Sequence, residues 1–517
     1  MVWEPEIEEL ERRRAMGRAM GGEERVQQQH DAGKLTVRER IDVLADPGTF
    51  REFGVMAGTA DYEGNDLAAF RPQPFVIGLV HVDGREVVVG GGDYTSRGAA
   101  RANDRSISKS AYAEKMALDL SVPIVRLIDA FGADIRAIES IGRTYIPANP
   151  HWEIAAQQLS EVPVVSVALG AVAGYPAAQM AAAHFSVMVR EMSQVFAAGP
   201  PVVERALGMP ITKEDLGGYL IHSRQSGLVD NDAADEAEAL SQVRRFLSYL
   251  PTNVWEAPPV LPCDDPTDRR EEALLSLVPR DRRRPYDART MVTLIMDRDS
   301  TFEMGRYFGR SLITMFARLD GHPVGVMAND PRQYGGSMDA AAAQKMEKFV
   351  DLCDTFHLPV VNFVDQPGFM VGPESEASGT LKHGVRALTA VYEATVPWAS
   401  VVVRRVYGVA GAGHQNHSRT NLRVAWPSGE WGSLPIEGGV MAAYRRQIES
   451  AADPEAERRE IEERLIALRS PFRTAEAFNI EDIIDPRETR AELVRWVRSS
   501  WRQIPRLLGK RGRGMRP

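Results

Sequence analysis

Residues 358–372, LPVVNFVDQPGFMVG, decide the fold, because they read as a buried strand that ends at a turn. The run is apolar and rich in β-branched side chains until Asp365, and Pro367 and Gly368 then favour a turn. Such an uninterrupted apolar run is typical of a strand in a parallel sheet whose two faces are both covered. The end of this strand is therefore expected to bring backbone to a site.

The same pattern occurs a second time, 236 residues earlier. In residues 122–132, VPIVRLIDAFG, Pro123 corresponds to Pro359 and Asp129 to Asp365 (359 − 123 and 365 − 129). Three further pairs keep nearly this offset: the Asp-Gly turns at 83–84 and 320–321 (320 − 83 = 237), Pro163 and Pro397 (397 − 163 = 234), and the Val-Ala-Gly triplets at 172–174 and 409–411 (411 − 174 = 237). Four matches in one order at nearly constant spacing predict a duplicated domain.

Length and composition agree with two ordinary globular domains. The 517 residues are too many for one core, and 44% of them are hydrophobic and 26% charged. The net charge of −9 gives no reason to expect a nucleic-acid partner. Two widely separated cysteines fit a reducing cytosol, and we see neither a secretory signal nor an apolar run of about 18 residues that would span a membrane.

Strands and helices alternate within each half, which predicts an α/β architecture. We expect a first domain over residues 1–251 and a second over residues 285–517. Residues 252–284 hold four prolines between positions 258 and 266 together with many charged residues, a composition typical of a linker.

The sequence lacks the motifs of the commonest catalytic mechanisms. It contains no GxxxxGK[ST], GxGxxG, HExxH or GxSxG pattern at the required place. His414 and His417 have a spacing that could bind a metal, but no third ligand lies at motif spacing, so we expect hydrogen bonding and no metal site.

Two turns of small residues remain as candidates, Gly170–Tyr175 and Tyr407–Gly413. A small-residue turn that leads into a helix exposes backbone N–H groups, and these suit a developing oxyanion. The competing interpretation is that the glycines only let strand and helix pack closely, and for either turn alone we favour it.

The whole chain resembles the carboxyltransferase (β) subunits of biotin-dependent acyl-CoA carboxylases, of the propionyl-CoA and methylcrotonyl-CoA carboxylase type. The resemblance rests on motifs that occur in the family's order along the chain: GKLTVRERIDVLADPGTF at 33–50, Gly217-Gly218 through Ser226-Gly227, RLDGHPVGVMAN at 318–329, CDTFHLPVVNFVDQPGFMVG at 353–372, EATVP at 393–397, Tyr407-Gly408, Ala425-Trp426-Pro427 and Ile484-Asp485-Pro486-Arg487.

The resemblance implies two tandem crotonase-like domains, with acyl-CoA in the first and carboxybiotin in the second. The implied thioester oxyanion hole is Gly174 and Tyr175, and the implied hole for the biotin carbonyl is Val409 and Ala410. The implied contacts with acyl-CoA are Gly98, Ala99, Gly132, Ala133 and Ala412. The implied contacts with biotin are Gly368, Phe369, Tyr407 and Gly408.

The sequence departs from the family mainly in the acyl-CoA half. The usual Ser-Gly-Gly-Ala-Arg after Asp129 is Ala-Phe-Gly-Ala-Asp here, and the usual Ala-Gly-Gly-Ala reads Ala-Gly-Tyr-Pro at residues 173–176. Tyr175 adds bulk and Pro176 removes a backbone donor. In the second half Ala412 replaces a position that is an acidic selector of acyl-chain size in some members.

We therefore expect a cytoplasmic carboxyltransferase that moves CO2 from carboxybiotin to an acyl-CoA enolate. The biotin carboxylase and the biotin carrier would be partner polypeptides, because the chain has no Ala-Met-Lys-Met signature and no ATP-binding glycine loop. The family implies a homo-hexamer, a trimer of dimers. Two alternatives stay open: an acyl-CoA decarboxylase or biotin-independent acyl-thioester enzyme on the same fold, and a non-catalytic scaffold paralogue.

Overall fold

The computed structural model describes residues 2–96, 108–130, 132, 138–139, 142–144, 146, 152–512 and 514–515. Contacts divide the chain into two compact units, residues up to Glu256 together with those from Gly509 onward, and Ala257–Leu508. The segment expected as a linker, 252–284, thus lies mostly in the second unit, and the chain's end joins the first. There the Gly509 N–H donates to the Val254 carbonyl over 2.7 Å.

The first unit is built on a seven-stranded sheet with the order β1-β4-β5-β6-β7-β9-β11. Its first two pairings, β1 with β4 and β4 with β5, are antiparallel, and all later pairings are parallel. The strands of this sheet are β1 (Arg51–Phe53), β4 (Phe75–Val82), β5 (Arg85–Gly92), β6 (Ile124–Ile128), β7 (Val164–Ala168), β9 (Phe185–Val189) and β11 (Asn231–Ala233). Two short pairs stand apart from it, β2 (Gly58–Glu63) with β3 (Asp66–Pro72) and β8 (Ala171–Ala173) with β10 (Gln194–Phe196).

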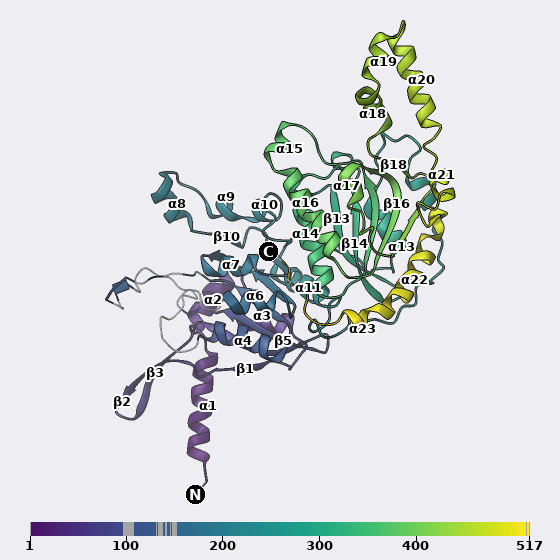
Figure 1. The fold of residues 1–517 in the computed structure, drawn as a ribbon. Coiled ribbons are helices and arrows are strands. Elements are labelled where there is room, and N and C mark those ends of the chain that lie inside the picture. Colours follow the sequence, from purple (N-terminus) through teal and green to yellow (C-terminus); the bar gives the residue numbers. More distant parts are fainter. Residues whose placement is uncertain are drawn as a thin grey trace. The chain divides into compact units, whose positions relative to one another are not determined.

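The main strand order of the second unit repeats this topology. Its sheet has the order β12-β13-β14-β15-β16-β17-β19, again with two antiparallel pairings followed by parallel ones. Figure 1 labels β13, β14, β16 and β18 of this unit. The strands are β12 (Phe302–Met304), β13 (Leu312–Leu319), β14 (His322–Asn329), β15 (Val360–Gln366), β16 (Trp398–Tyr407), β17 (Leu422–Ala425) and β19 (Asp482–Ile483), with β18 (Glu430–Gly432) paired to β16. The predicted duplication is confirmed.

Side-chain contacts are duplicated as well. Asp46 accepts from the backbone N–H groups of the hairpin turn at 83–84, and Asp297 does the same for the turn at 320–321. Both hairpins turn through Asp-Gly pairs with positive φ, as a two-residue turn of this kind requires. These equivalent contacts close the same corner in each unit.

The helices of the first unit connect and cover its strands. They are α1 (Glu4–Arg18), α2 (Glu23–Asp31), α3 (Val37–Leu44), α4 (Lys109–Leu120), α6 (Trp152–Gln158), α7 (Tyr175–Ala181), α8 (Pro200–Leu207), α9 (Lys213–Gly217), α10 (Tyr219–His222) and α11 (Glu236–Leu247). Thr36 caps the start of α3, where Thr36 and Glu39 form a reciprocal capping box.

The helices of the second unit include two charged ones between residues 445 and 466. In chain order they are α12 (Leu274–Leu277), α13 (Ala288–Ile295), α14 (Ala340–Thr355), α15 (Pro373–Ala377), α16 (Thr380–Glu393), α17 (Gly408–Ala412), α18 (Ile436–Ala443), α19 (Arg445–Ser450), α20 (Pro454–Ile466), α21 (Pro471–Glu476), α22 (Thr489–Ser500) and α23 (Ile504–Leu507), with 3-10 turns at Tyr334–Gly336, Pro486–Glu488 and Trp501–Gln503. Among the residues that the structure describes, no helix is long and apolar enough to cross a bilayer.

Both faces of the second sheet are buried, as the apolar run at 358–372 predicts. Alternate strand residues such as Met315 and Phe363 join one core cluster with α13 and α22. On the opposite face Phe316 packs on Phe349 of α14 with ring centroids 5.6 Å apart. Helix α14 lies so close that a Cβ on Gly325 would fall 2.4 Å from the sulfur of Cys353.

Candidate active site

The first candidate turn follows β8 and starts α7. Gly174 is exposed and has φ +70° and ψ −131°, a conformation that only glycine adopts without strain. Tyr175 is half-buried and its ring meets Trp152 edge-on, with centroids 6.2 Å apart. Pro176 occupies the second helical position, so the bulk and the missing donor expected from the sequence are both present at this turn.

Gly132 lies against this turn. Its N–H donates to the Ala173 carbonyl over 2.9 Å, and a Cβ on Gly132 would be 2.7 Å from the Tyr175 nitrogen. Strands β6 and β7 are parallel neighbours, so the loops that follow them meet at one edge of the sheet. The structure thus joins Gly132, Gly174 and Tyr175 in one place, whereas Gly98, Ala99 and Ala133 lie outside the described residues.

A buried carboxylate holds the end of β6. Asp129 is fully buried, and its Oδ2 accepts from Lys34 at 3.2 Å and from Arg40 at 3.4 Å. Arg40 also donates to the Leu169 carbonyl and to Glu236, which ties α11 to this edge. Because both strand ends are held by one guanidinium, the loop that carries Gly132 starts from a fixed point.

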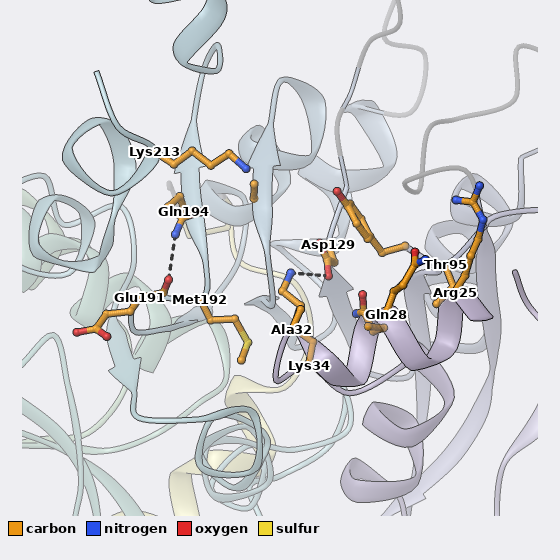
Figure 2. Close-up of a pocket in the computed structure, with 13 residues that line it drawn as sticks. Arg25, Gln28, Ala32, Lys34, Thr95, Asp129, Glu191, Met192, Gln194 and Lys213 are labelled. Atoms are coloured by element: carbon orange, nitrogen blue, oxygen red, sulfur yellow. Dashed lines mark hydrogen bonds and ion pairs between the residues drawn. The ribbon is translucent and has the colours of Figure 1, made fainter. Parts of the chain in front are cut away.

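A cavity of about 480 Å³ opens beside Asp129 and β8. Figure 2 shows two contacts within its lining, Lys34 with Asp129 and Gln194 with the Glu191 carbonyl. Arg25, Lys34 and Lys213 line the cavity, so it could take an anionic group. Of the residues predicted for the site, none that the structure describes lines this cavity.

The second candidate turn lies at the equivalent edge of the other sheet. Gly368 follows β15 and Gly408 follows β16, and these strands are parallel neighbours paired at Gln366 and Val406. Gly368 and Gly408 have φ of +129° and +61°. A Cβ on Gly368 would meet open space, so the backbone there stays accessible to a reactant.

The residues around Gly408 differ in accessibility. Val409 is 56% exposed whereas Ala410 is 7% exposed, and both belong to the first turn of α17, whose N–H groups have no partner within the helix. The hydroxyl of Tyr407 is buried beside Glu430. Loss of solvent and the nearby negative charge of Glu430 together raise the pKa of Tyr407 to about 12. The phenol therefore stays protonated and donates to Glu430.

The phenyl ring of Phe369 packs within the second unit. It lies so close to α16 that a Cβ on Gly384 would be 2.2 Å from the ring. The neighbouring Gly368 carbonyl accepts from the Met338 N–H over 3.0 Å. Phe369 therefore anchors the loop that carries Gly368.

A buried carboxylate also holds the end of β15. Asp365 accepts from Arg404 at 2.9 Å and from Arg405 at 2.6 Å. It is the repeat partner of Asp129, and each of the two carboxylates binds two cations. In the first unit the cations come from residues 34 and 40, whereas here they come from β16 itself.

A cavity of about 430 Å³ adjoins the second turn and is lined by Gly408, Ala412, His414 and His417. The Nδ1 of His414 lies 2.7 Å from the Gly411 carbonyl, so Nδ1 carries the proton, and burial lowers the pKa of His414 to about 4. His417 contacts the Ala412 carbonyl through Nε2 at 3.2 Å. Within the described part of the chain, no three His, Cys, Asp or Glu side chains are grouped as a metal site.

Sequence reasoning identified both turns and both strand-end aspartates but missed the groups that hold them. Lys34 and Arg40 lie inside the motif at 33–50, which could have pointed to them. Glu430 carries no such signal, because its role depends on the pairing of β18 with β16.

Comparison with known proteins places these features in one family. The model of the carboxyl transferase domain matches residues 28–514. The carboxyltransferase subunit of propionyl-CoA carboxylase from Haloferax mediterranei is 35% identical over 505 residues, 96% of each chain. The α subunit of methylmalonyl-CoA decarboxylase from Veillonella parvula is 31% identical over 495 residues, 94% of each chain.

A solved structure is similar over the whole chain. Transcarboxylase 12S, crystallised as a hexamer assembly with hydrolysed methylmalonyl-coenzyme A bound, has a TM-score of 0.88 and 31% identity, and the match covers 100% of this chain and 98% of that one. A single-chain, multi-domain long-chain acyl-CoA carboxylase matches with a TM-score of 0.79 and 27% identity, over 95% of this chain and 50% of that one.

Proposed function

This chain belongs to the carboxyl transferase family, and we propose that its two duplicated units hold the two reactants of one carboxyl transfer. It has the crotonase-like fold twice, and its function is that of the carboxyltransferase of an acyl-CoA carboxylase, acting on a CoA thioester and carboxybiotin. In our proposal Gly174 and Tyr175 hold the thioester oxygen, and Val409 and Ala410 hold the ureido oxygen of biotin.

The reaction requires negative charge to be stabilised on both reactants in turn. Breaking the C–N bond of carboxybiotin releases CO2 and leaves the electron pair on the ureido group, which then takes the α-proton of the thioester. The resulting enolate attacks CO2, so atoms and charge balance without a basic side chain. Backbone N–H groups suit both anions, because they are held in place before charge develops.

The observation that supports this proposal is the equivalence of the two turns. Each lies at the carboxyl end of the same parallel strand pair, β6 and β7 or β15 and β16, beyond a buried aspartate that is held by two cations. In parallel α/β sheets this edge is the usual place for a ligand. Two equivalent edges would suit two reactants that each need an oxyanion site.

The proposal is tested by removing one backbone donor. A purified biotin carrier is loaded with ¹⁴C-carboxylate, mixed with this chain, and assayed for acid-stable label in propionyl-CoA and in longer acyl-CoAs. Ala410→Pro removes an N–H in the first turn of α17, so we expect transfer to fall by about 10² to 10³. Val409→Ala keeps its N–H and should transfer within about threefold of the parent rate.

Two controls separate the possible failures. Release of labelled CO2 from the carrier without acyl-CoA reports on the second unit alone, and it should fall with Ala410→Pro. If neither the parent chain nor any variant transfers label to any acyl-CoA, the scaffold alternative replaces the proposal. If Ala410→Pro transfers at the parent rate, the assignment of the second oxyanion site is wrong.

A decarboxylase is the second candidate, and relatives named methylmalonyl-CoA decarboxylase favour it. The same turns could stabilise the enolate left when a carboxyl group departs from the thioester. Methylmalonyl-CoA is incubated with the chain, with and without biotinylated carrier, and propionyl-CoA is measured. Net loss of CO2 without transfer in the opposite direction would favour the decarboxylase, and loss without any carrier would favour a biotin-independent enzyme.

The proposal also covers the choice of acyl group, the partner polypeptides and the oligomeric state. Tyr175 and the small Ala412 border the two turns, so we expect them to select the acyl chain. Separate biotin carboxylase and carrier polypeptides would be the partners, and a cytoplasmic location stays a prediction. A hexamer like that of transcarboxylase 12S would have six times the chain mass of 57.2 kDa, which mass photometry measures directly.

A further inference from the structure

The second unit contains a larger cavity, of about 740 Å³, whose lining is rich in arginine. Arg280, Arg282, Arg404 and Arg469 line it, and Glu430 is the sole carboxylate among its described lining residues. Two of the arginines belong to the run at 280–285, RDRRRP, for which carboxyl transfer supplies no role.

Positive charge exceeds negative charge around this cavity. Arg404 is committed to Asp365 at 2.9 Å, while Arg282 and Arg469 both pair with Glu430, the latter at 3.5 Å. Arg280 is exposed, and the described residues give it no hydrogen bond or ion pair. Four guanidinium groups therefore face two carboxylates.

The chemistry of this lining selects the ligand class. Guanidinium groups bind phosphate oxygens with paired, charge-assisted hydrogen bonds, and several of them together favour a multiply charged anion. Leu275, Val278 and Ile466 line the same cavity and offer an apolar surface. A cavity of this size lies in the usual range of small-molecule sites, about 300 to 1,000 Å³.

We infer that this cavity binds a phosphorylated small molecule, with its phosphate on Arg280, Arg282 and Arg469 and its apolar part on Leu275 and Val278. The binding does not depend on the carboxyl-transfer proposal. The site nonetheless adjoins the second turn, because Glu430 accepts the hydroxyl of Tyr407 and its strand β18 pairs with the end of β16.

Variants that remove a positive charge from the cavity, and one that removes its negative charge, test this inference. Inorganic pyrophosphate and adenosine monophosphate are titrated calorimetrically into the full chain at low salt, the first as a bare anion and the second as an anion with an apolar body. Arg280→Gln and Arg469→Gln should each weaken binding about tenfold, the loss of one charge-assisted hydrogen bond. Glu430→Gln removes the competing carboxylate and should tighten binding several-fold.

The matched control is Arg445→Gln, which removes the same charge from an exposed arginine of α19 that does not line the cavity. It should leave both dissociation constants unchanged. Thermal unfolding checks each variant, and exposed Arg280 keeps the test valid if the half-buried Arg469 is needed for folding. The inference is overturned if the parent chain binds neither probe at millimolar concentration, if Arg445→Gln weakens binding as much as Arg280→Gln, or if Glu430→Gln weakens it.

Discussion

Replacing Gly132 with alanine probes the first oxyanion turn without touching a side chain of the site. The added Cβ would lie 2.7 Å from the Tyr175 nitrogen and 2.9 Å from the Pro176 ring. Because a carbon needs about 3.5 Å from such an atom, the turn or the Gly132 loop must move by roughly 0.8 Å. A misplacement of about 1 Å costs on the order of 10²-fold in rate, so kcat for transfer to acyl-CoA should fall by about that factor.

The assay also locates the defect. Transfer from ¹⁴C-carboxylated carrier to propionyl-CoA should fall, whereas CO2 release from the carrier alone should not change, because it uses the second turn. Gly199→Ala is the control in the same unit, since its Cβ would meet only ordinary contacts, the nearest at 3.5 Å. Transfer within about threefold of the parent rate in a folded Gly132→Ala protein would refute the placement of Tyr175 at the thioester oxygen.

Three further predictions concern buried ionisable groups. Asp365→Ala leaves Arg404 buried without its carboxylate, so the free energy of unfolding measured in urea should fall by about 3–5 kcal/mol. Glu449→Ala removes an exposed ion pair and should lower this free energy by under about 1 kcal/mol. Equal losses in the two variants would contradict the prediction. Burial lowers the pKa of His414 to about 4, so between pH 4 and 6.5 the unfolded chain binds more protons than the folded chain. The free energy of unfolding should therefore fall by up to about 3 kcal/mol as the pH drops from 6.5 to 4. If the free energy of unfolding of His414→Gln depends on pH as steeply as that of the parent, the prediction is wrong. Burial lowers the pKa of Lys345 to about 7, so between pH 7 and 10.5 the unfolded chain holds a proton that the folded chain has lost. From pH 7 to pH 9 the free energy of unfolding of the parent should therefore rise by about 2–3 kcal/mol relative to that of Lys345→Met, in matched urea titrations. A difference that stays constant over this range would contradict the lowered pKa.

Features encoded in short stretches of sequence were the ones that could be predicted. The apolar runs before Asp129 and Asp365, and the Asp-Gly turns at 83–84 and 320–321, each depend on a few neighbouring residues. Their repetition therefore predicted two sheets of one topology, which the strand orders confirm. The two turns could be proposed as sites because small residues after a strand are a local signal too, and their role stays a prediction.

The groups that hold these turns in place could not be predicted in the same way. Arg40 meets Glu236 across 196 residues, and Arg404 reaches the carbonyls of residues 282 and 284 in the segment expected as a linker. Such contacts depend on how distant elements pack, and no local pattern carries that information. Most of the segment expected as a linker belongs to the second unit, and there Arg318 donates to the Pro259 carbonyl, a contact that the local composition does not reveal.

Some contacts occur in both units and others in only one. The shared contacts position the strands, and the differing ones belong to the chemistry of each unit. Arg38 pairs with Glu52 in the first unit as Arg289 pairs with Glu303 in the second, both at an offset of 251 (289 − 38 and 303 − 52). Duplicated pairs of this kind fix the edges of the sheets. They therefore hold the first edge strand, β1 or β12, in the same way in each unit.

The turns themselves have diverged. The first has a half-buried tyrosine followed by a proline without an N–H, and the second has Val409 and Ala410 at the start of α17 beside a cavity lined by Gly408 and Ala412. If both turns received the same reactant, nothing would favour such different shapes on sheets of the same strand order. Turns that differ in this way suit two unlike reactants, and for this reason a variant at Gly132 should impair one half-reaction while a variant at Ala410 impairs both.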